Sequence, residues 1–217
     1  MARDIDLHLP VLVYRVGGTA FLKDQVKEMI HRTNEKLYEQ NTGIKIVWEN
    51  DIEIVTEKSF AYVYYDQDVG YMNLRELLKN GADSGKLRIF LVKVDVSEHS
   101  GSWTYDPIDS VESDEYPNLW RGAIFITEQF NDNSDQRYKD MGYPESSDTL
   151  LHELGHVLMQ DETHYSGDKY NFMHELPEYL DSTIFPSQVS RMRGDPKPRQ
   201  RHTPYYLVPA PPTPPQP

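Results

Sequence analysis

Short apolar runs rich in β-branched residues alternate along this chain with segments of helical periodicity, and few architectures accommodate that order. Residues 9–16 form the first such run. In residues 21–40 the apolar side chains recur at helical spacing, with Asn34 as a polar break. The Asn-Thr-Gly sequence at 41–43 then predicts the end of that helix. This order predicts a mixed α/β or α+β sheet with helices packed on it, and we favour α+β.

The rest of the chain continues the same order. Apolar patterns predict further strands at residues 44–48, 52–55, 87–94 and 122–127. Helical periodicity predicts helices at residues 71–79, 147–160 and 186–193. Residues 97–121 and 131–147 are polar and rich in turn formers, so we expect loops there.

The composition changes after residue 194. Nine of the chain's 15 prolines fall within residues 195–217. Such a segment favours polyproline-type backbone and builds no core of its own. It is either a flexible spacer, which we favour, or a docking peptide for another domain or partner.

Composition also limits the chemistry and the partners. The chain has no cysteine, so a metal site must use histidines and carboxylates. A net charge of −13 repels phosphate backbones and argues against nucleic acid as a partner. No apolar run approaches the ~20 residues of a membrane span, and the N-terminal residues do not resemble a secretory signal. We therefore expect a protein exported without a visible signal peptide, or a cytoplasmic one.

His152 and His156 are four residues apart within the strongly apolar segment 150–158. On an amphipathic helix, the two imidazoles lie one turn apart on the same face. Imidazoles so placed can bind one Zn²⁺ at ~2.0–2.1 Å. Glu153, next to the first histidine, is then positioned as a general base. The alternative interpretation is two surface histidines on an ordinary helix.

A catalytic zinc takes three protein ligands and keeps one position open, so a third ligand must come from elsewhere. The candidates are the nearby histidines and carboxylates, namely Asp161, Glu162, His164, His174, Glu175 and Glu178. His164 lies eight residues after His156, and a turn after the helix would bring it back to the metal; we favour it. Glu162 and Asp161 are better explained as capping, water-binding or ligand-orienting groups.

The HELGH sequence at residues 152–156, His164 and the NFMH sequence at residues 171–174 together resemble the metzincin clan of zinc endopeptidases. In that clan a helix holds two histidines and the general-base glutamate, and a third histidine follows after a turn. A tight turn further downstream, the Met-turn, places a methionine beneath the metal. The resemblance therefore implies one catalytic zinc on His152, His156 and His164, with Glu153 as base and Met173 as an apolar floor.

The resemblance also implies an architecture for residues 1–194. A twisted mixed β-sheet, a backing helix and the active-site helix form an N-terminal subdomain at about 1–158. A small C-terminal subdomain at about 159–194 holds the Met-turn and the helix at 186–193. An edge strand within residues 105–127 binds the substrate backbone by β-addition.

Two departures from the clan's pattern leave alternatives open. The third histidine usually comes six residues after the second, where this chain has Glu162, so we interpret His164 as displaced by a two-residue insertion and keep Glu162 as the alternative ligand. Some members carry a tyrosine two residues after the methionine, where this chain has Glu175. The group that stabilises the oxyanion is therefore open among Tyr165, Tyr170 and Tyr179.

Two further metal assignments rank lower. A gluzincin-type site would take Glu175 or Glu178 from a downstream helix, but Pro177 breaks a helix there. Residues 131–135, Asn-Asp-Asn-Ser-Asp, offer alternating oxygens for Ca²⁺, although a solvated turn explains them better.

Together these patterns predict a monomeric zinc metalloendopeptidase that hydrolyses peptide bonds in a protein or peptide substrate. The alternative is a catalytically silent module that keeps the fold and binds a partner through residues 195–217. Glu153 favours turnover, because a scaffold needs no base beside its metal.

Overall fold

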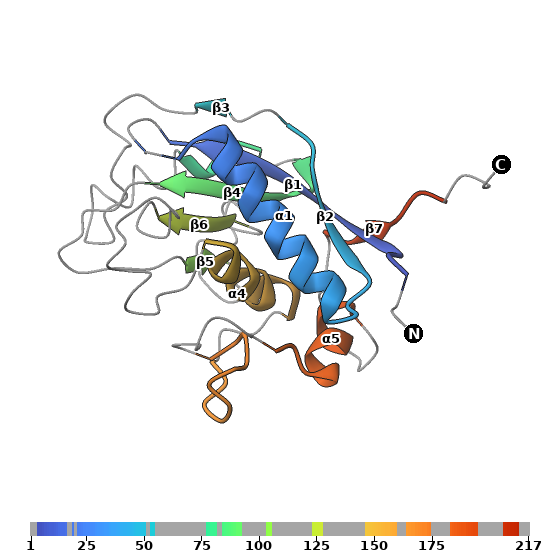
Figure 1. Ribbon diagram of the computed structural model, residues 1–217. Coiled ribbons are helices and arrows are strands. Elements are labelled where there is room, and N and C mark those ends of the chain that lie inside the picture. Colours follow the sequence, from blue (N-terminus) through green and yellow to red (C-terminus); the bar gives the residue numbers. More distant parts are fainter. Residues whose placement is uncertain are drawn as a thin grey trace, which may run out of the picture.

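The computed structural model describes residues 4–16, 19, 21–50, 53–54, 77–81, 84–92, 103–105, 123–127, 146–159, 164–174, 183–194 and 206–212. The strands within this part of the chain are β1 (Leu7–Arg15), β2 (Ile44–Trp48), β3 (Glu53–Ile54), β4 (Leu87–Val92), β5 (Trp103–Tyr105), β6 (Ala123–Thr127) and β7 (Val208–Pro209). The helices are α1 (Lys23–Glu39), α4 (Ser146–Met159) and α5 (Pro186–Met192) (Figure 1). None of the described helices has the length and apolar character that crossing a bilayer requires.

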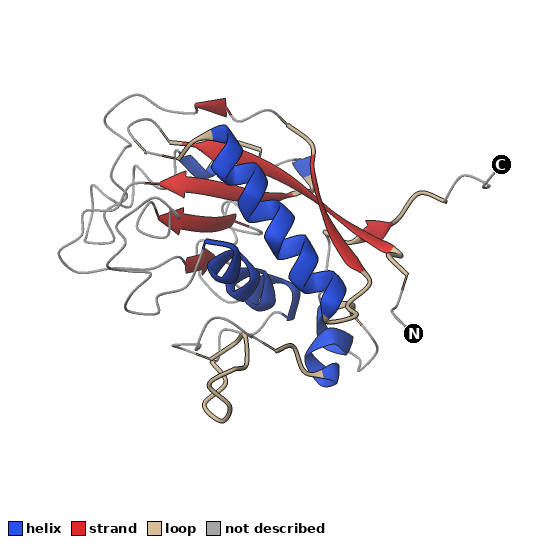
Figure 2. Cartoon of the chain, in the orientation of Figure 1, coloured by secondary structure: helices blue, strands red, loops and turns tan. Residues whose placement is uncertain are grey.

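The strands form one mixed sheet in the order β2-β1-β4-β6-β5, with β3 and β7 also paired to β1 (Figure 2). The pairings among β1, β2, β3, β4 and β6 are parallel, whereas β5 and β7 run antiparallel to their neighbours. Parallel neighbours need a crossover, and α1 supplies the one between β1 and β2. The fold is therefore α+β on a mixed sheet, as the sequence predicts.

Two asparagine side chains complete the hydrogen bonding around β2. Ile46 N donates to Asn34 Oδ1 at 2.7 Å, and Asn34 Nδ2 donates back to Ile46 O at 3.1 Å. Asn34, the polar residue in the apolar pattern of α1, thus hydrogen-bonds the outer edge of β2. Asn50 makes the same two-way contact with Val13, at 2.8 and 3.0 Å, between the stretches of β1 that pair with β2 and β3. These amides replace absent strand neighbours, so the backbone groups stay satisfied.

Helices α1 and α4 lie over one face of the sheet (Figure 1). Alternate residues of the central strands are buried in the core that the two helices share. The strand members are Leu9, Val11, Val13, Leu87, Ile89, Leu91, Ile124 and Ile126. The helix members include Val26, Met29, Leu37, Leu150, Leu151, Leu154 and Leu158. The apolar face of each helix therefore determines how it sits on the sheet.

Several intervening residues of the same strands are buried as well. Tyr14, Phe90 and Phe125 stand in register on β1, β4 and β6, with neighbouring ring centroids 5.3 Å apart and ring planes at 19°. Arg88 is fully buried beside them, and its guanidinium donates to the carbonyl of Leu78. Burial on both faces explains why β4 appears in the sequence as a continuous apolar run rather than an alternating one.

Most predicted elements lie where the sequence places them. The Asn-Thr-Gly stop after α1 adopts the left-handed backbone that ends helices, with φ of 54° at Asn41 and 70° at Gly43. One prediction was wrong, because β5 lies inside the segment 97–121 that we expected to be loop. A strand of three residues is too short to show a periodic pattern. The predicted helix at 71–79 is described only from residue 77, and most of the predicted loops at 97–121 and 131–147 lie outside the described residues.

Part of the Pro-rich segment returns to the sheet. β7 pairs antiparallel with Leu7 and His8, and Ala210 N donates to Asp6 O at 2.9 Å. Arg193, just after α5, binds both carboxylate oxygens of Asp6 at 2.8 and 2.6 Å. Because β2 already pairs with the same part of β1, β7 occupies the opposite edge, before β4 begins. Residues 206–212 thus add a strand segment to the edge of β1, and Arg193 binds Asp6 next to it.

Candidate metal centre

Helix α4 carries both histidines of the HELGH sequence and is held in place at its first turn. Asp148 is buried there and forms an ion pair with Lys36 of α1; the two side chains are 5% and 23% exposed. A carboxylate at this end of a helix also complements the helix dipole. Together with the apolar face that packs into the core, this pair fixes α4 against α1 and holds His152 and His156 partly exposed.

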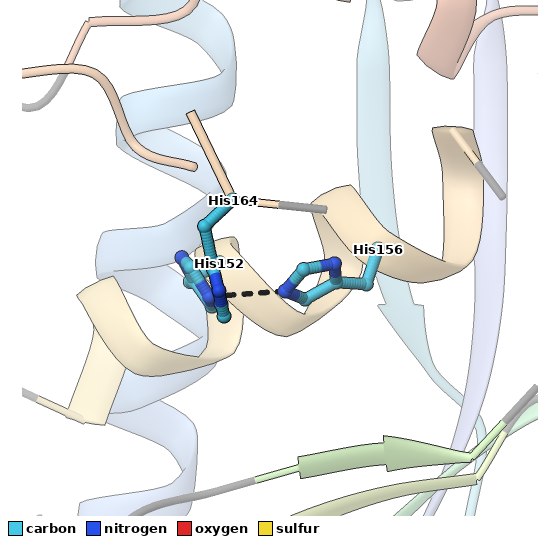
Figure 3. A group of neighbouring side chains, drawn as sticks. All are labelled: His152, His156 and His164. Atoms are coloured by element: carbon cyan, nitrogen blue, oxygen red, sulfur yellow. Dashed lines mark hydrogen bonds between the residues drawn. The ribbon is translucent and has the colours of Figure 1, made fainter. Parts of the chain in front are cut away.

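His152, His156 and His164 come together in one cluster (Figure 3). One ring nitrogen from each lies within 4.8 Å of the others. The ring of His164 stacks on that of His152 at 5.1 Å and 20°, and meets His156 edge-on at 5.1 Å. Three imidazoles from a helix and the loop after it thus face one small volume.

His152 is oriented by the main chain. Its Nδ1 donates to the carbonyl oxygen of Phe172 at 2.7 Å. A carbonyl only accepts, so Nδ1 carries the proton and Nε2 keeps a free lone pair. That Nε2 accepts from His156 Nε2 at 3.1 Å. The carbonyl therefore selects the tautomer in which the ligand nitrogen faces the cluster.

The protonation state of His152 suits a metal ligand. Burial, and secondly the neighbouring His156, lowers the pKa of His152 from 6.5 to about 4, against an opposing effect of the Phe172 hydrogen bond. The ring is therefore neutral at physiological pH, which is the form that binds a metal. A charged imidazole at His152, with two further imidazoles beside it, would be an electrostatic cost to the fold.

The loop from 164 to 174 is closed by backbone hydrogen bonds. Tyr165 N donates to Met173 O at 2.8 Å, which joins the start of the loop to its end. His174 N donates to Asn171 O at 2.9 Å and closes a tight turn over residues 171–174. His164 precedes the first of these bonds, so the closed loop brings it back over α4.

Gly155 lets this turn approach α4 closely. A Cβ at Gly155 would overlap the sulfur of Met173 and come within 2.5 Å of Cε2 of Phe172. Met173 and Phe172 are both 1% exposed. Packing thus favours glycine at this position of the HELGH sequence, because any side chain would force the buried side chains of Met173 and Phe172 to shift.

The donor set fits zinc. Bonds of ~2.0–2.1 Å in a tetrahedral site separate two ligand nitrogens by about 3.3 Å. The Nε2 atoms of His152 and His156 are 3.1 Å apart, close to that separation. Three imidazoles with no thiolate are also a ligand set that catalytic zinc uses.

Some of the other predicted site residues are described by the structure, and the rest lie outside the described residues. Glu153 is 4% exposed on α4, and His174 is half-buried after the turn. Tyr165 packs its ring edge-on against Phe185 at 5.4 Å, and the ammonium of Lys169 lies 5.2 Å from the ring centroid of Tyr170. Asp161, Glu162, Glu175, Pro177, Glu178, Tyr179 and residues 131–135 lie outside the described residues.

Sequence reasoning missed the groups that hold the turn, namely the Phe172 carbonyl, Asn171 and Gln188. A backbone acceptor leaves no mark in a sequence. Gln188 does leave one, since it is the third residue of α5 and takes the hydrogen bond from Phe185 N as a capping glutamine does, at 2.9 Å.

The predicted edge strand is tested only in part, because residues 106–122 lie outside the described residues. We expected it within residues 105–127, but β6 occupies most of the described part of that range and lies between β4 and β5. The strand at this end of the described sheet is β5, which begins at Trp103 and pairs with β6 from Trp103–Phe125 to Tyr105–Ala123. Only Tyr105 of the predicted range belongs to it.

Comparisons with known proteins bear on the fold and not on the sequence family. No protein-family model and no curated protein matches the sequence. The chain is similar to the solved metalloproteinase-II from Bacteroides fragilis, at 15% identity and a TM-score of 0.49, over 88% of this chain and 54% of that one. It is also similar to a chain in a solved chaperone-substrate complex, at 9% identity and a TM-score of 0.52, over 87% of this chain and 33% of that one.

This chain thus spans about half the length of the first structure and a third of the second. The second likeness shows a shared fold alone, and the first, with its lower TM-score, carries no argument. The three-histidine cluster on an α+β fold is therefore the feature from which function must be argued.

Proposed function

We propose that this chain is a zinc-dependent metalloendopeptidase. The observation that carries the proposal is the convergence of His152, His156 and His164, whose ring nitrogens lie within 4.8 Å of one another. Two of them come from a helix that also bears a buried glutamate, Glu153, beside the first. The neutral tautomer of His152 and the approach of a third imidazole from the next loop both support a metal site.

In this proposal the three histidines hold one zinc ion and Glu153 is the general base. Zinc on three protein ligands supplies Lewis acidity and keeps one position open for water. Binding there lowers the pKa of the water towards ~7. Glu153 accepts the proton of the attacking water and passes it to the leaving amine of the cleaved peptide. Met173, packed on Gly155, is the apolar floor of the site.

The substrate is a protein or peptide bound in extended form. β5 lies at the end of the described sheet and contacts α4, the helix that carries two of the histidines. In this proposal its outer edge offers backbone donors and acceptors to the substrate. An extended peptide that adds to this edge gains affinity from main-chain hydrogen bonds, largely independent of its sequence.

The experiment measures zinc content and peptide cleavage in the full chain and in Glu153→Gln. We expect one zinc per chain in both proteins, because Glu153 is not a ligand. Cleavage of a peptide library should fall about 100- to 10,000-fold in the variant, the usual contribution of a general base. His164→Ala should lower the zinc content as well as the activity, which separates the ligand from the base.

Two outcomes would contradict the proposal in different ways. If the wild-type chain binds no zinc at micromolar free metal, the three histidines are not a zinc site. A chain that binds one zinc but cleaves nothing in the library would favour the silent binding module, whose function would then be sought in residues 195–217.

A further inference from the structure

The side chain of Asn171, at the start of the turn beneath the histidines, has every polar position filled. Its Oδ1 accepts from Met173 N at 3.0 Å and from Gln188 Nε2 at 2.9 Å. Its Nδ2 donates to Gln188 Oε1 at 2.7 Å and to Thr183 O at 3.3 Å. An amide offers two acceptor and two donor positions, so this side chain is fully satisfied while it is 0% exposed.

Gln188 is the partner that links this turn to α5. It is buried, exchanges two hydrogen bonds with Asn171, and its Oε1 also accepts from Phe185 N at 2.9 Å. Backbone donors determine the orientation of both amides, because Met173 N requires an oxygen of Asn171 and Phe185 N requires an oxygen of Gln188. The pair therefore has one arrangement, and a buried hydrogen-bond network with a single arrangement is rigid.

This pair sits next to the carbonyl that orients His152. Phe172 lies between Asn171 and Met173, and its own N donates to Thr183 O at 3.1 Å while its O accepts from His152 Nδ1. The direction of the Phe172 carbonyl therefore depends on how residues 171–173 are held. Asn171 holds them from one side and Gln188 holds Asn171.

We propose that Asn171 and Gln188 are positioning residues that act through the Phe172 carbonyl to fix the tautomer of His152, and that zinc affinity depends on them. The consequence for zinc rests on the proposed function; the consequence for the tautomer does not. Partners beyond the direct ligands commonly change metal affinity by about 10- to 100-fold. Gln188 acts through Asn171, so we expect its substitution to change zinc affinity by about tenfold, the lower end of that range.

The test compares Gln188→Met with Val189→Ala in the full chain. Methionine keeps the length of glutamine but cannot make its hydrogen bonds. Val189 is its buried neighbour on α5 and belongs to the core rather than to the amide pair, so its truncation loosens α5 without touching Asn171. Gln188→Asn, a milder change that keeps an amide but shortens its reach, serves if the methionine variant does not fold.

Two quantities are measured in each protein. The first is the zinc dissociation constant, from competition with a chelator of known affinity. The second is the pair of ¹⁵N chemical shifts of the His152 ring in the zinc-free protein, which distinguish a proton on Nδ1 from one on Nε2. The wild-type chain should show the Nδ1 form.

We expect the glutamine variants to weaken zinc binding about tenfold more than Val189→Ala does. Their His152 shifts should move towards a mixture of the two tautomers, whereas Val189→Ala keeps the wild-type shifts. The inference is overturned if His152 keeps its tautomer in the glutamine variants, or if their zinc affinity equals that of Val189→Ala. If the wild-type chain binds no zinc, the proposed function fails, and the ring shifts alone decide the role of Gln188.

Discussion

The Nδ1 nitrogen of His152 and the carbonyl oxygen of Phe172 are 2.7 Å apart, and this hydrogen bond joins α4 to the turn at residues 171–174. Because the acceptor is a main-chain atom, no substitution of the Phe172 side chain removes it directly. Its position depends instead on the packing of the turn. The consequences can be tested at residues that touch the turn, the helix or the sheet edge.

Gly155→Ala tests the close approach of the turn to α4. Helix propensity alone favours alanine by about 1 kcal/mol. The added Cβ overlaps Met173 and Phe172, and overpacking of this kind costs about 1–3 kcal/mol. We expect the overlap to outweigh the propensity, so that urea unfolding shows a less stable protein and chelator competition shows weaker zinc binding.

The matched control for Gly155→Ala is the same change in a Met173→Ala background. Removing the sulfur relieves part of the overlap, so the added methyl should cost less there. Equal costs in the two backgrounds would mean that the turn does not press on Gly155 in solution.

The stability of the zinc-free protein should fall between pH 7 and pH 5. The pKa of His152 is lowered to about 4 by burial and by His156, so between pH 4 and 6.5 the unfolded chain binds a proton there that the folded chain does not. Stability therefore declines as the pH falls through that window. From this group alone we expect a loss of about 2 kcal/mol between pH 7 and pH 5, measured by urea unfolding with chelator present.

His152→Gln is the reference for this pH dependence, since every other titrating group is retained. Its stability should fall less steeply over the same interval by about that amount. Parallel curves for the two proteins would show that His152 titrates normally in the folded chain.

Lys36→Met tests the ion pair that holds α4 against α1. The change removes the cation from the buried carboxylate of Asp148, and the loss should be about 1–3 kcal/mol, less than for a fully buried pair because Lys36 is 23% exposed. Lys27→Met on the same helix is the control. Its pair with Asp24 is exposed, so unfolding should change by less than about 0.5 kcal/mol. If both variants lose similar stability, the ion pair between Lys36 and Asp148 does not hold α4 against α1.

Truncation after Gly194 tests the returning strand segment. It removes β7, uncovers Leu7 and His8 on the edge of β1, and removes the partly buried Tyr206 and Leu207 from the core. We expect a stability loss of about 1–2 kcal/mol. Zinc affinity and turnover should not change, because the described contacts of β7 lie on β1. Truncation after Pro212 keeps β7 and should behave as wild type.

A change in turnover after removal of residues 195–217 would contradict this expectation. It would show that residues 195–217 affect the histidine cluster, rather than only completing the sheet.

Several features could be predicted from the sequence because they depend on local patterns. The stop of α1 at residues 41–43 and the extent of β2 follow from turn chemistry and alternation. β5 and β7 could not be predicted, because they lie in segments rich in turn formers or proline, where no apolar pattern marks a strand and only the pairing with a partner reveals it. Asn34 appears in the sequence as a defect of the α1 pattern, and only the structure shows its contact with Ile46.

The sequence by itself determined which groups can bind a metal, since helical spacing places His152 and His156 on one face, and the lack of cysteine limits the ligands to histidines and carboxylates. The tertiary structure decided that His164 joins them and that His152 offers Nε2. Both outcomes depend on contacts between residues far apart in sequence, from Tyr165 to Met173 and from Asn171 to Gln188. Spacing along a chain specifies a helix face, but only the packing of distant segments determines where a loop returns and which atom its backbone presents.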